Sequence, residues 1–423
     1  MTANLQSFQL TSAGELEVFP EDTIEKLKKY AYIFRKCTFL LASWISLSPE
    51  IEIKVLFGDH IHRDALTFRK CLDRLLSLGF SGDGNSDFSN YLNEDICKVS
   101  LLKNSARKLV AMYQGLKSNI LMDVKRFAKE IHSILDQPTV RLCSEIIIDI
   151  ESQIEEARCL QEKLCCIFPD IYTISEDYGD LLQNIPSNAF CLTVPDLPAR
   201  DKRFRLTNDS SVWTNHQKWQ DNVIQDIHFL LMSLEIVSIE VCSRNILEFT
   251  TLPWDFILDM TRQCWDESRH AKALYNRILE LGGEIGGYPI DYNLWLMTSG
   301  LPLAVRLAIH QRIGEWIGVD AAILSVSDCE NNNDFISAQI YTYITRDEIT
   351  HVNFGNKWIR YLASSDEEVK NIHQVAQAQR DKFKGTSPLV PFPFNRWACE
   401  LSGFTNQEID ELEIEVNQRR KKA

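Results

Sequence analysis

The sequence is poor in the residues that interrupt helices. Its 423 residues include 17 Gly and 13 Pro, and both types cluster, which leaves long windows without a helix breaker. With 45% apolar and 25% charged residues, the composition excludes collagen-like, low-complexity and largely disordered chains. The length is sufficient for two or three domains with buried cores.

Signals for membrane insertion, secretion and structural zinc are also missing. No uninterrupted apolar run reaches the roughly 18 residues that a membrane span needs. The 12 Cys are scattered with no C-x-x-C spacing, which is typical of free thiols in helical cores. The N-terminal stretch carries acidic residues and lacks the basic and apolar regions of a signal peptide. We therefore expect a soluble, reduced, cytoplasmic protein.

Basic residues are outnumbered, with 45 Lys and Arg against 59 Asp and Glu and a formal net charge of −14. This balance disfavours nucleic acid and anionic membrane surfaces as partners. The one conspicuous basic run, R-D-K-R-F-R at 200–205, lies in a Pro-containing stretch of weak periodicity. We interpret it as a solvated linker.

Apolar residues recur at helical spacing throughout, which predicts an all-α fold. The predicted helices span 22–47, 48–79, 104–136 and 137–167, then 217–249, 254–282, 302–325 and 332–364. We expect an N-terminal helical bundle over 1–168, a linker over 169–216, a second bundle over 217–364, and a helical tail over 365–423 that packs on it. The long segment between the second and third helices of the second bundle has the length of the crossover in ferritin-like four-helix bundles.

Two histidines of the second bundle follow a glutamate by three residues, in Glu267-Ser-Arg-His270 and Glu348-Ile-Thr-His351. Residues three apart are neighbours on a helix surface, so each pair presents a carboxylate and an imidazole together. Each Glu also lies within an apolar stripe of its helix. An unpaired carboxylate there would be costly to bury, which favours metal ligands over a surface ion-pair network.

An aspartate precedes each glutamate, at Asp266 and Asp347. A histidine bound to a metal normally gives its other ring N–H to a carboxylate. Because adjacent residues point about 100° apart on a helix, each Asp faces the neighbouring helix. We expect a crossed arrangement, in which Asp347 orients His270 and Asp266 orients His351.

Two further carboxylates are expected from the first and third helices of this bundle. In the third helix we favour Glu315 over the shorter Asp320. In the first helix the choice is between Glu235 and Glu240, which point about 140° apart. Glu240 precedes Arg244 by four residues, the spacing of an exposed helix ion pair, so we favour Glu235.

The resulting order is E, E-x-x-H, E, E-x-x-H, which is the ligand set of di-iron carboxylate bundles. The six predicted metal ligands are Glu235, Glu267, His270, Glu315, Glu348 and His351. Hard carboxylates with two imidazoles suit two Fe ions, or an Fe/Mn pair, with O2 as co-substrate. Structural zinc would favour a closed set rich in Cys.

The C-terminal part resembles an uncharacterised ferritin-like domain family over roughly residues 190–405. The resemblance rests on LEIVSIEV, DESRHA, LGGEIGGYPIDYNLW, GEWIGVD, RDEITHVNFGNKW and PFNRWACELSGF. It implies a ferritin-like fold and a metal site in which the first Glu of LEIVSIEV, Glu235, is a ligand. Ser238 stands where the family usually has Ala.

The N-terminal half resembles an accessory bundle found beside this domain, through IEIKVLFGDHIHRDALTFRKCLDRL and QPTVRLCSEIIIDIESQIEEA. We interpret it as a degenerate bundle without metal that packs on or gates the other. His60 and His62 are two residues apart and face different sides of a helix, so we expect a helix surface there and no ligands.

These features favour a non-haem di-iron enzyme that uses O2 to hydroxylate, desaturate or cleave a small organic molecule, with a separate electron donor. Tyr341 is a candidate catalytic residue. Tyr288, Tyr292, Trp295 and the P-F-P-F run of the tail are candidate walls of a substrate pocket. The alternatives are a ferroxidase or peroxide scavenger, a di-iron tRNA hydroxylase and a non-catalytic scaffold. The oligomeric state is open, and a homodimer is compatible with the sequence.

Overall fold

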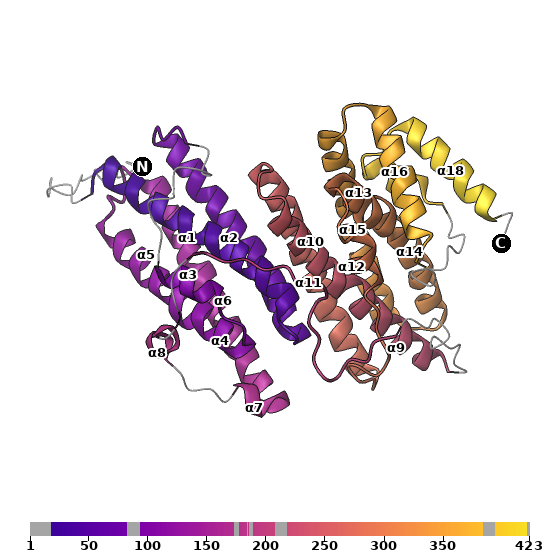
Figure 1. Ribbon diagram of the computed structural model, residues 1–423, viewed down its shortest axis with the longest axis horizontal. Helices are drawn as coiled ribbons and strands as arrows, with labels where there is room; N and C mark the ends of the chain where they lie inside the picture. The colour runs from indigo at the N-terminus through magenta and orange to yellow at the C-terminus, as the bar shows by residue number, and fades with distance from the viewer. Residues whose placement is uncertain are drawn as a thin grey trace, which may run out of the picture. The chain divides into compact units, whose positions relative to one another are not determined.

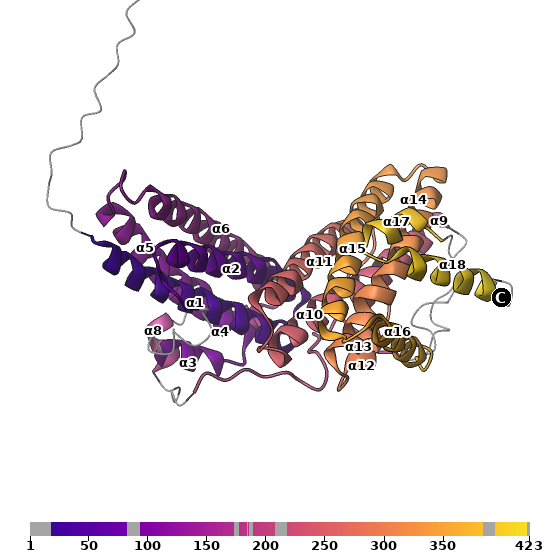
Figure 2. The same cartoon turned by 90° about the horizontal axis from the view of Figure 1, so that it is seen from above.

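A computed structural model describes residues 18–82, 94–172, 177–183, 185, 189–207, 218–383 and 394–420 (Figures 1 and 2). The regular structure over these residues is helical, apart from one isolated bridge between Leu206 and Ile290. The prediction of an all-α fold is therefore confirmed. None of the helices in the described ranges combines the length and apolar character that crossing a membrane requires.

The chain divides into two compact units that do not follow chain order. Unit 1 comprises 1–38 and 63–191, and unit 2 comprises 39–62 and 192–423. The sequence-based division assigned 39–62 to the N-terminal bundle. In the structure the last third of α1 (Pro20–Leu47) and the first part of α2 (Ile51–Ser77) group with the C-terminal unit.

Unit 1 contains the remaining parts of α1 and α2 together with a series of helices that ends near residue 182. These are α3 (Glu94–Ser100), α4 (Ser105–Leu109), the π-helical segment η2 (Val110–Lys117), α5 (Ser118–Glu130), α6 (Gln137–Ile167), α7 (Pro169–Tyr172) and α8 (Tyr178–Leu182). The α6 helix begins where the sequence predicts, because the Asp136 side chain accepts a hydrogen bond from Thr139 N and Pro138 occupies the first turn. Tyr30 and Phe127 pack edge to face in the core between α1 and α5.

Unit 2 contains four long helical segments, two of which are interrupted by π-helical turns. The first is α9 (Trp219–Phe229), η4 (Leu230–Glu235) and α10 (Ile236–Glu248), and the second is α11 (Trp254–Glu280). The third is α13 (Leu303–Leu307), η5 (Ala308–Glu315) and α14 (Trp316–Asn331), and the fourth is α15 (Phe335–Leu362). The α10 helix packs on α11, α11 on α15, and α15 on both η5 and α14 (Figure 1).

The crossover and the tail complete unit 2. The crossover between α11 and α13 carries the short helix α12 (Asn293–Thr298), and the tail forms α16 (Asp366–Arg380), α17 (Arg396–Leu401) and α18 (Asn406–Arg420). The α16 helix begins at Ser365, whose hydroxyl accepts a hydrogen bond from Glu368 N, and it packs on η5 and α13. Trp316 of α14 packs on Phe394 and Phe404, which joins the tail to the bundle.

Two predictions about polar residues are wrong. The basic run at 200–205 is only partly solvated: Lys202 and Arg205 are exposed, but the side chain of Arg200 is buried against Glu240. Arg203 pairs with both Glu52 and Asp201. His60 and His62 are not on a surface either, since both are buried, and His62 stacks on Trp265. The burial comes from α2 packing against elements of unit 2, which are distant in the sequence.

Candidate metal centre

Both E-x-x-H pairs lie on inward faces of their helices. Glu267 and His270 of α11 are 1% and 3% exposed, and Glu348 and His351 of α15 are 4% and 0% exposed. Their apolar neighbours at helical spacing are buried as well. On α11 these are Met260, Cys264, Ala271 and Leu274, and on α15 they include Tyr341 and Val352. Because of the 3.6-residue period, one imidazole and one carboxylate of each helix lie together in the interior of unit 2.

Four helical segments bring six metal-ligating side chains together in two overlapping groups. In each group the potential ligand atoms lie within 4.8 Å of one another. The first group is Glu235, Glu267, His270 and Glu348, and the second is Glu267, Glu315, Glu348 and His351. Glu267 and Glu348 belong to both groups, so their carboxylates face two potential ion positions.

The Nδ1 atoms of the two imidazoles face the carboxylates. His270 Nδ1 lies 3.1 Å from Glu235 Oε2 and 3.2 Å from Glu267 Oε2. His351 Nδ1 lies 2.8 Å from Glu348 Oε2 and 3.4 Å from Glu267 Oε1. These separations place the oxygen and nitrogen atoms of each group around a common centre.

The opposite ring nitrogens contact the two aspartates in the crossed arrangement described above. His270 Nε2 lies 3.1 Å from Asp347 Oδ2, and His351 Nε2 lies 3.3 Å from Asp266 Oδ2. Because an ionised carboxylate only accepts hydrogen bonds, each Nε2 carries its proton. A neutral imidazole then has a lone pair on Nδ1, the atom that faces the glutamates.

The ligands of the first and third segments follow π-helical turns. The η4 segment ends at Glu235 and η5 ends at Glu315. A π turn is closed by hydrogen bonds between residues five apart instead of four, so it shifts the inward face by about one residue relative to an α-helix. Such turns are frequent at functional sites. This explains why neither glutamate follows a single apolar period along its segment, as Glu267 and Glu348 do.

The competing carboxylates point elsewhere. Glu240 is buried, but it pairs with Lys54 Nζ at 2.8 Å and with Arg200 Nη2 at 2.9 Å. The expected exposed pair of Glu240 with Arg244 is wrong, because Arg244 is buried and donates to the Trp295 carbonyl. Asp320 accepts a hydrogen bond from Asn395 Nδ2 at 2.6 Å.

Burial and mutual repulsion dominate the electrostatics of the centre. Burial, reinforced by neighbouring carboxylates, raises the pKa of Glu235 and of Glu348 well above the ordinary glutamate value. Burial also opposes the charging of His270 and His351, but the facing carboxylates outweigh it and raise the pKa of both imidazoles. For Glu267, burial is outweighed by the two imidazoles, which hold its pKa below the ordinary range. A positive charge placed beside these carboxylates therefore stabilises their ionised forms.

Three polar residues that the sequence analysis missed support the ligands. Gln263 Nε2 donates to both Glu267 and Glu315 at 2.9 Å, and Arg269 contacts both Asp266 and Asp347. His310 Nε2 lies 2.8 Å from Glu315 Oε1 and 2.8 Å from the Ser238 hydroxyl. Gln263 precedes Glu267 by four residues, so the helical period alone could have predicted that the two side chains are neighbours. His310 precedes Glu315 by five residues, and residues at this spacing come into contact in a π turn.

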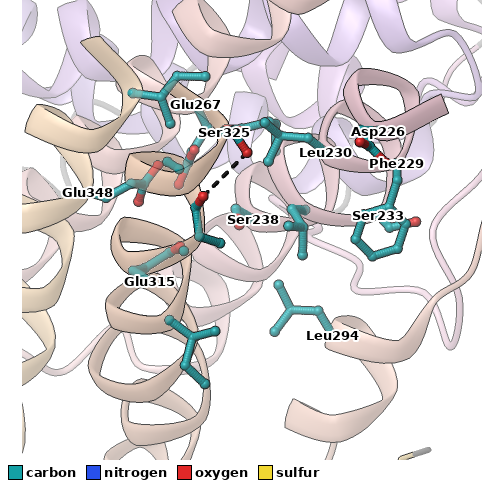
Figure 3. Close-up of a pocket in the computed structure, with 18 of the residues that line it drawn as sticks. Asp226, Phe229, Leu230, Ser233, Ser238, Glu267, Leu294, Glu315, Ser325 and Glu348 are labelled. Atoms are coloured by element: carbon teal, nitrogen blue, oxygen red, sulfur yellow. Dashed lines mark hydrogen bonds between the residues drawn. The ribbon is translucent and has the colours of Figure 1, made fainter. Parts of the chain in front are cut away.

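A cavity of about 420 Å³ opens beside the carboxylates (Figure 3). Glu235, Glu267, Glu315 and Glu348 reach it from one side, and Tyr341, buried to 6% exposure, is part of its wall. Its apolar lining comes from the first, third and fourth helical segments of the bundle and from the crossover. These residues include Phe229, Leu230, Leu234, Leu294, Met297, Ile317, Ala321, Ala322, Leu324 and Ile344.

The crossover contributes to this cavity, but through residues other than those expected. Tyr288, Tyr292 and Trp295 do not line it: their polar atoms donate to the carbonyls of Asp221, Pro198 and Asp196. Leu294 and Met297 of α12 line it instead. In the P-F-P-F run, residues 391–393 lie outside the described residues, and Phe394 packs on Trp316.

Comparisons with known proteins identify a family but no activity. A relative from Haemophilus influenzae (strain ATCC 51907 / DSM 11121 / KW20 / Rd), described as an uncharacterized protein, is 26% identical over 267 residues, which cover 60% of this chain and 87% of the relative. No solved structure matches the chain. The model of the family described as "Protein of unknown function (DUF455)" matches residues 174–410, which is more than half of the chain and includes the whole candidate metal centre. The chain therefore belongs to the DUF455 family of proteins of unknown function.

Proposed function

We propose that unit 2 is a ferritin-like bundle that binds two iron ions and uses O2 to oxidise a small organic molecule. The observation that carries the proposal is the pair of overlapping ligand groups, which share Glu267 and Glu348. Four carboxylates and two imidazoles from four helical segments form the ligand set of di-iron carboxylate bundles. The four segments and the long crossover match the topology of such bundles.

The residues fit a pair of divalent ions in charge as well as in number. Four glutamates converge in a buried place, where their charges repel one another and raise the pKa of Glu235 and Glu348. Two bound cations would remove this repulsion. Hard oxygen ligands with two imidazoles favour Fe or Mn over a zinc site built on thiolates.

The roles of the residues follow from the two groups. Glu235 and His270 would hold one ion, Glu315 and His351 the other, and Glu267 and Glu348 would face both. When bound, a pair of ferrous ions supplies the electrons that activate O2. Asp347 and Asp266 keep each imidazole in the tautomer whose Nδ1 is free to bind.

The cavity supports an organic substrate over iron oxidation alone. Its volume and largely apolar walls are those of a small-molecule pocket, and it reaches the same carboxylates that would hold the ions. Burial raises the pKa of the Tyr341 hydroxyl, so this residue enters the cavity as a neutral phenol that can donate a proton or hydrogen bond to a bound molecule. Reduction of O2 to water needs more electrons than a two-electron oxidation of the substrate supplies, so the reaction also needs a separate electron donor.

Oxygen uptake by the iron-loaded protein tests the proposal. The full chain is loaded anaerobically with Fe(II) until the centre is filled and is then exposed to O2 in an oxygen electrode. We expect uptake to stop after one turnover per centre, even when more Fe(II) is added, and to resume only with a chemical reductant and an oxidisable organic compound. Uptake in proportion to all the Fe(II) added would instead identify a ferroxidase.

The Glu267→Gln variant is the control, because this carboxylate faces both ion positions. It should bind less iron and show no uptake. Uptake at the wild-type rate by this variant would contradict the proposed centre.

A further inference from the structure

The cavity beside the metal centre contains one arginine, which the sequence analysis did not single out. Arg380 is the last residue of α16, and its side chain lines the cavity together with Gly314 and Glu315. Its Nη1 donates to the Ile309 carbonyl at 3.0 Å. A Cβ atom on Gly314 would lie 3.3 Å from the same nitrogen, so the glycine leaves room for the guanidinium beside the segment that ends in Glu315.

Arg380 forms no ion pair within the described part of the chain, whereas two other arginines of unit 2 pair with glutamates. Arg200 pairs with Glu240 and Arg312 pairs with Glu408. Burial lowers the pKa of Arg380 to about 10, while the field of Glu315 opposes this shift. If Glu315 binds a metal ion, as proposed above, its charge is neutralised and the guanidinium loses that support. A cation so placed is stabilised by an anion that enters the cavity.

One acidic residue of the cavity wall, Asp226, lies far from Arg380 along the bundle. Asp226 and Ser238 belong to the same helical segment, about 18 Å apart along its axis at the usual rise per residue. Ser238 contacts His310, and Arg380 contacts the carbonyl of Ile309, the preceding residue. Arg380 therefore lies near the level of Ser238, about 18 Å along this axis from Asp226, and apolar residues of the cavity wall lie between these two levels.

We infer that this site takes an organic anion with an apolar body, and that Arg380 binds its anionic group while the body lies along the apolar wall beside the carboxylates. The inference rests on the proposed function and adds a class of substrate to it. The guanidinium presents a planar pair of donors, which suits a carboxylate or another oxyanion. Arg380 is then a positioning residue that sets which end of the substrate approaches the centre.

Binding of four eight-carbon probes to the iron-loaded full chain, measured by titration calorimetry under anaerobic conditions, tests the inference. Octanoate and octane-1-sulfonate carry an anionic group, octanamide is neutral and octylamine is cationic. The sulfonate distinguishes binding by the Arg380 guanidinium from binding by the iron ions, because a sulfonate pairs with a guanidinium but is a weak ligand of iron. We expect both anions to bind about tenfold or more tightly than octanamide, and octylamine to bind weakest.

The Arg380→Gln variant should lose the preference for anions, and Arg380→Lys should retain part of it. Lys370→Gln is the matched control: it removes one positive charge from the same helix, at an exposed residue that pairs with Glu411 away from the cavity. This control should bind all four probes as the wild type does. If Arg380 only satisfies the Ile309 carbonyl, its replacement will lower the thermal midpoint and leave the order of the four probes unchanged.

Two outcomes would overturn the inference. The first is tighter binding of octylamine than of octanoate, which would show that Asp226, and not Arg380, binds the polar group of the probe. The second is an Arg380→Gln variant that still binds octanoate tightly but no longer binds the sulfonate. This result would show that the metal ions, and not Arg380, bind the anionic group. Iron content and O2 uptake are measured on the same samples. A preference for anions without bound iron would therefore refute the proposed function and leave Arg380 as an anion site.

Discussion

Replacing Glu240 by Gln should destabilise unit 2 and leave its metal content unchanged. Glu240 is fully buried and has two cationic partners, Lys54 and Arg200. Lys54 Nζ also donates to the Ile45 carbonyl at 2.7 Å. Burial lowers the pKa of Lys54 to about 8, and the charge of Glu240 is the main force that opposes this shift.

The magnitude follows from what the substitution leaves behind. Glutamine keeps the shape of the side chain but removes its charge, so two buried cations would face each other without a counter-ion. Removing one partner of a buried ion pair typically costs about 3–5 kcal/mol in the free energy of unfolding. Because Glu240 lies outside both groups of potential metal ligands, the amount of bound iron should not fall.

Glu235→Gln is the matched control, five residues earlier in the same helical segment. Its carboxylate faces Glu267 and has a raised pKa, so the neutral amide should cost the metal-free protein little stability. It should instead lower the amount of bound iron. Urea unfolding followed by circular dichroism, with iron analysis on the same preparations, measures both effects. If Glu240→Gln loses iron, or costs less than about 1 kcal/mol, the assignment of the two glutamates is wrong.

Three further predictions concern the surroundings of the centre. Asp347→Asn should weaken metal binding by about 10- to 100-fold in a competition assay with a chelator, because it removes the carboxylate that orients an imidazole; unchanged affinity would contradict this role. Gly355→Ala should cost about 1–3 kcal/mol in urea unfolding, because the new Cβ would lie 2.7 Å from Gln311 Cβ, whereas Gly318→Ala, whose Cβ meets no neighbouring element within 4 Å, should raise stability by up to about 1 kcal/mol. Burial lowers the pKa of His228 from 6.5 to about 4, so the unfolded state binds more protons between these values and stability should fall by about 3 kcal/mol as the pH drops through this window. His228→Gln should remove that part of the pH dependence in the metal-free protein, and an unchanged slope would refute it.

The helices and two inward faces could be predicted because their signals are local. The E-x-x-H pairs lie in apolar stripes of uninterrupted α-helix, so the 3.6-residue period places Glu267 and Glu348 correctly on inward faces. Pro138 and its preceding Asp136 likewise mark the start of α6 from adjacent residues alone.

The features that escaped prediction depend on π turns or on distant partners. The η4 and η5 segments are short, and their sequences carry no local signal that separates a π turn from an α-helical turn. The burial of Glu240 depends on Lys54 and Arg200, which are distant in sequence. Arg380 comes from the tail, and only the packing of α16 on η5 brings it to the cavity.

The most direct test of the central claim is a crystal structure of the iron-loaded protein with anomalous diffraction measured at the iron edge. We predict two anomalous peaks between α11, α15 and the ends of η4 and η5, about 3.5–4 Å apart, one in each group of ligands. His270 Nδ1 should contact one ion and His351 Nδ1 the other. A single peak on the protein surface, or none, in a crystal that retains this arrangement of side chains would contradict the account.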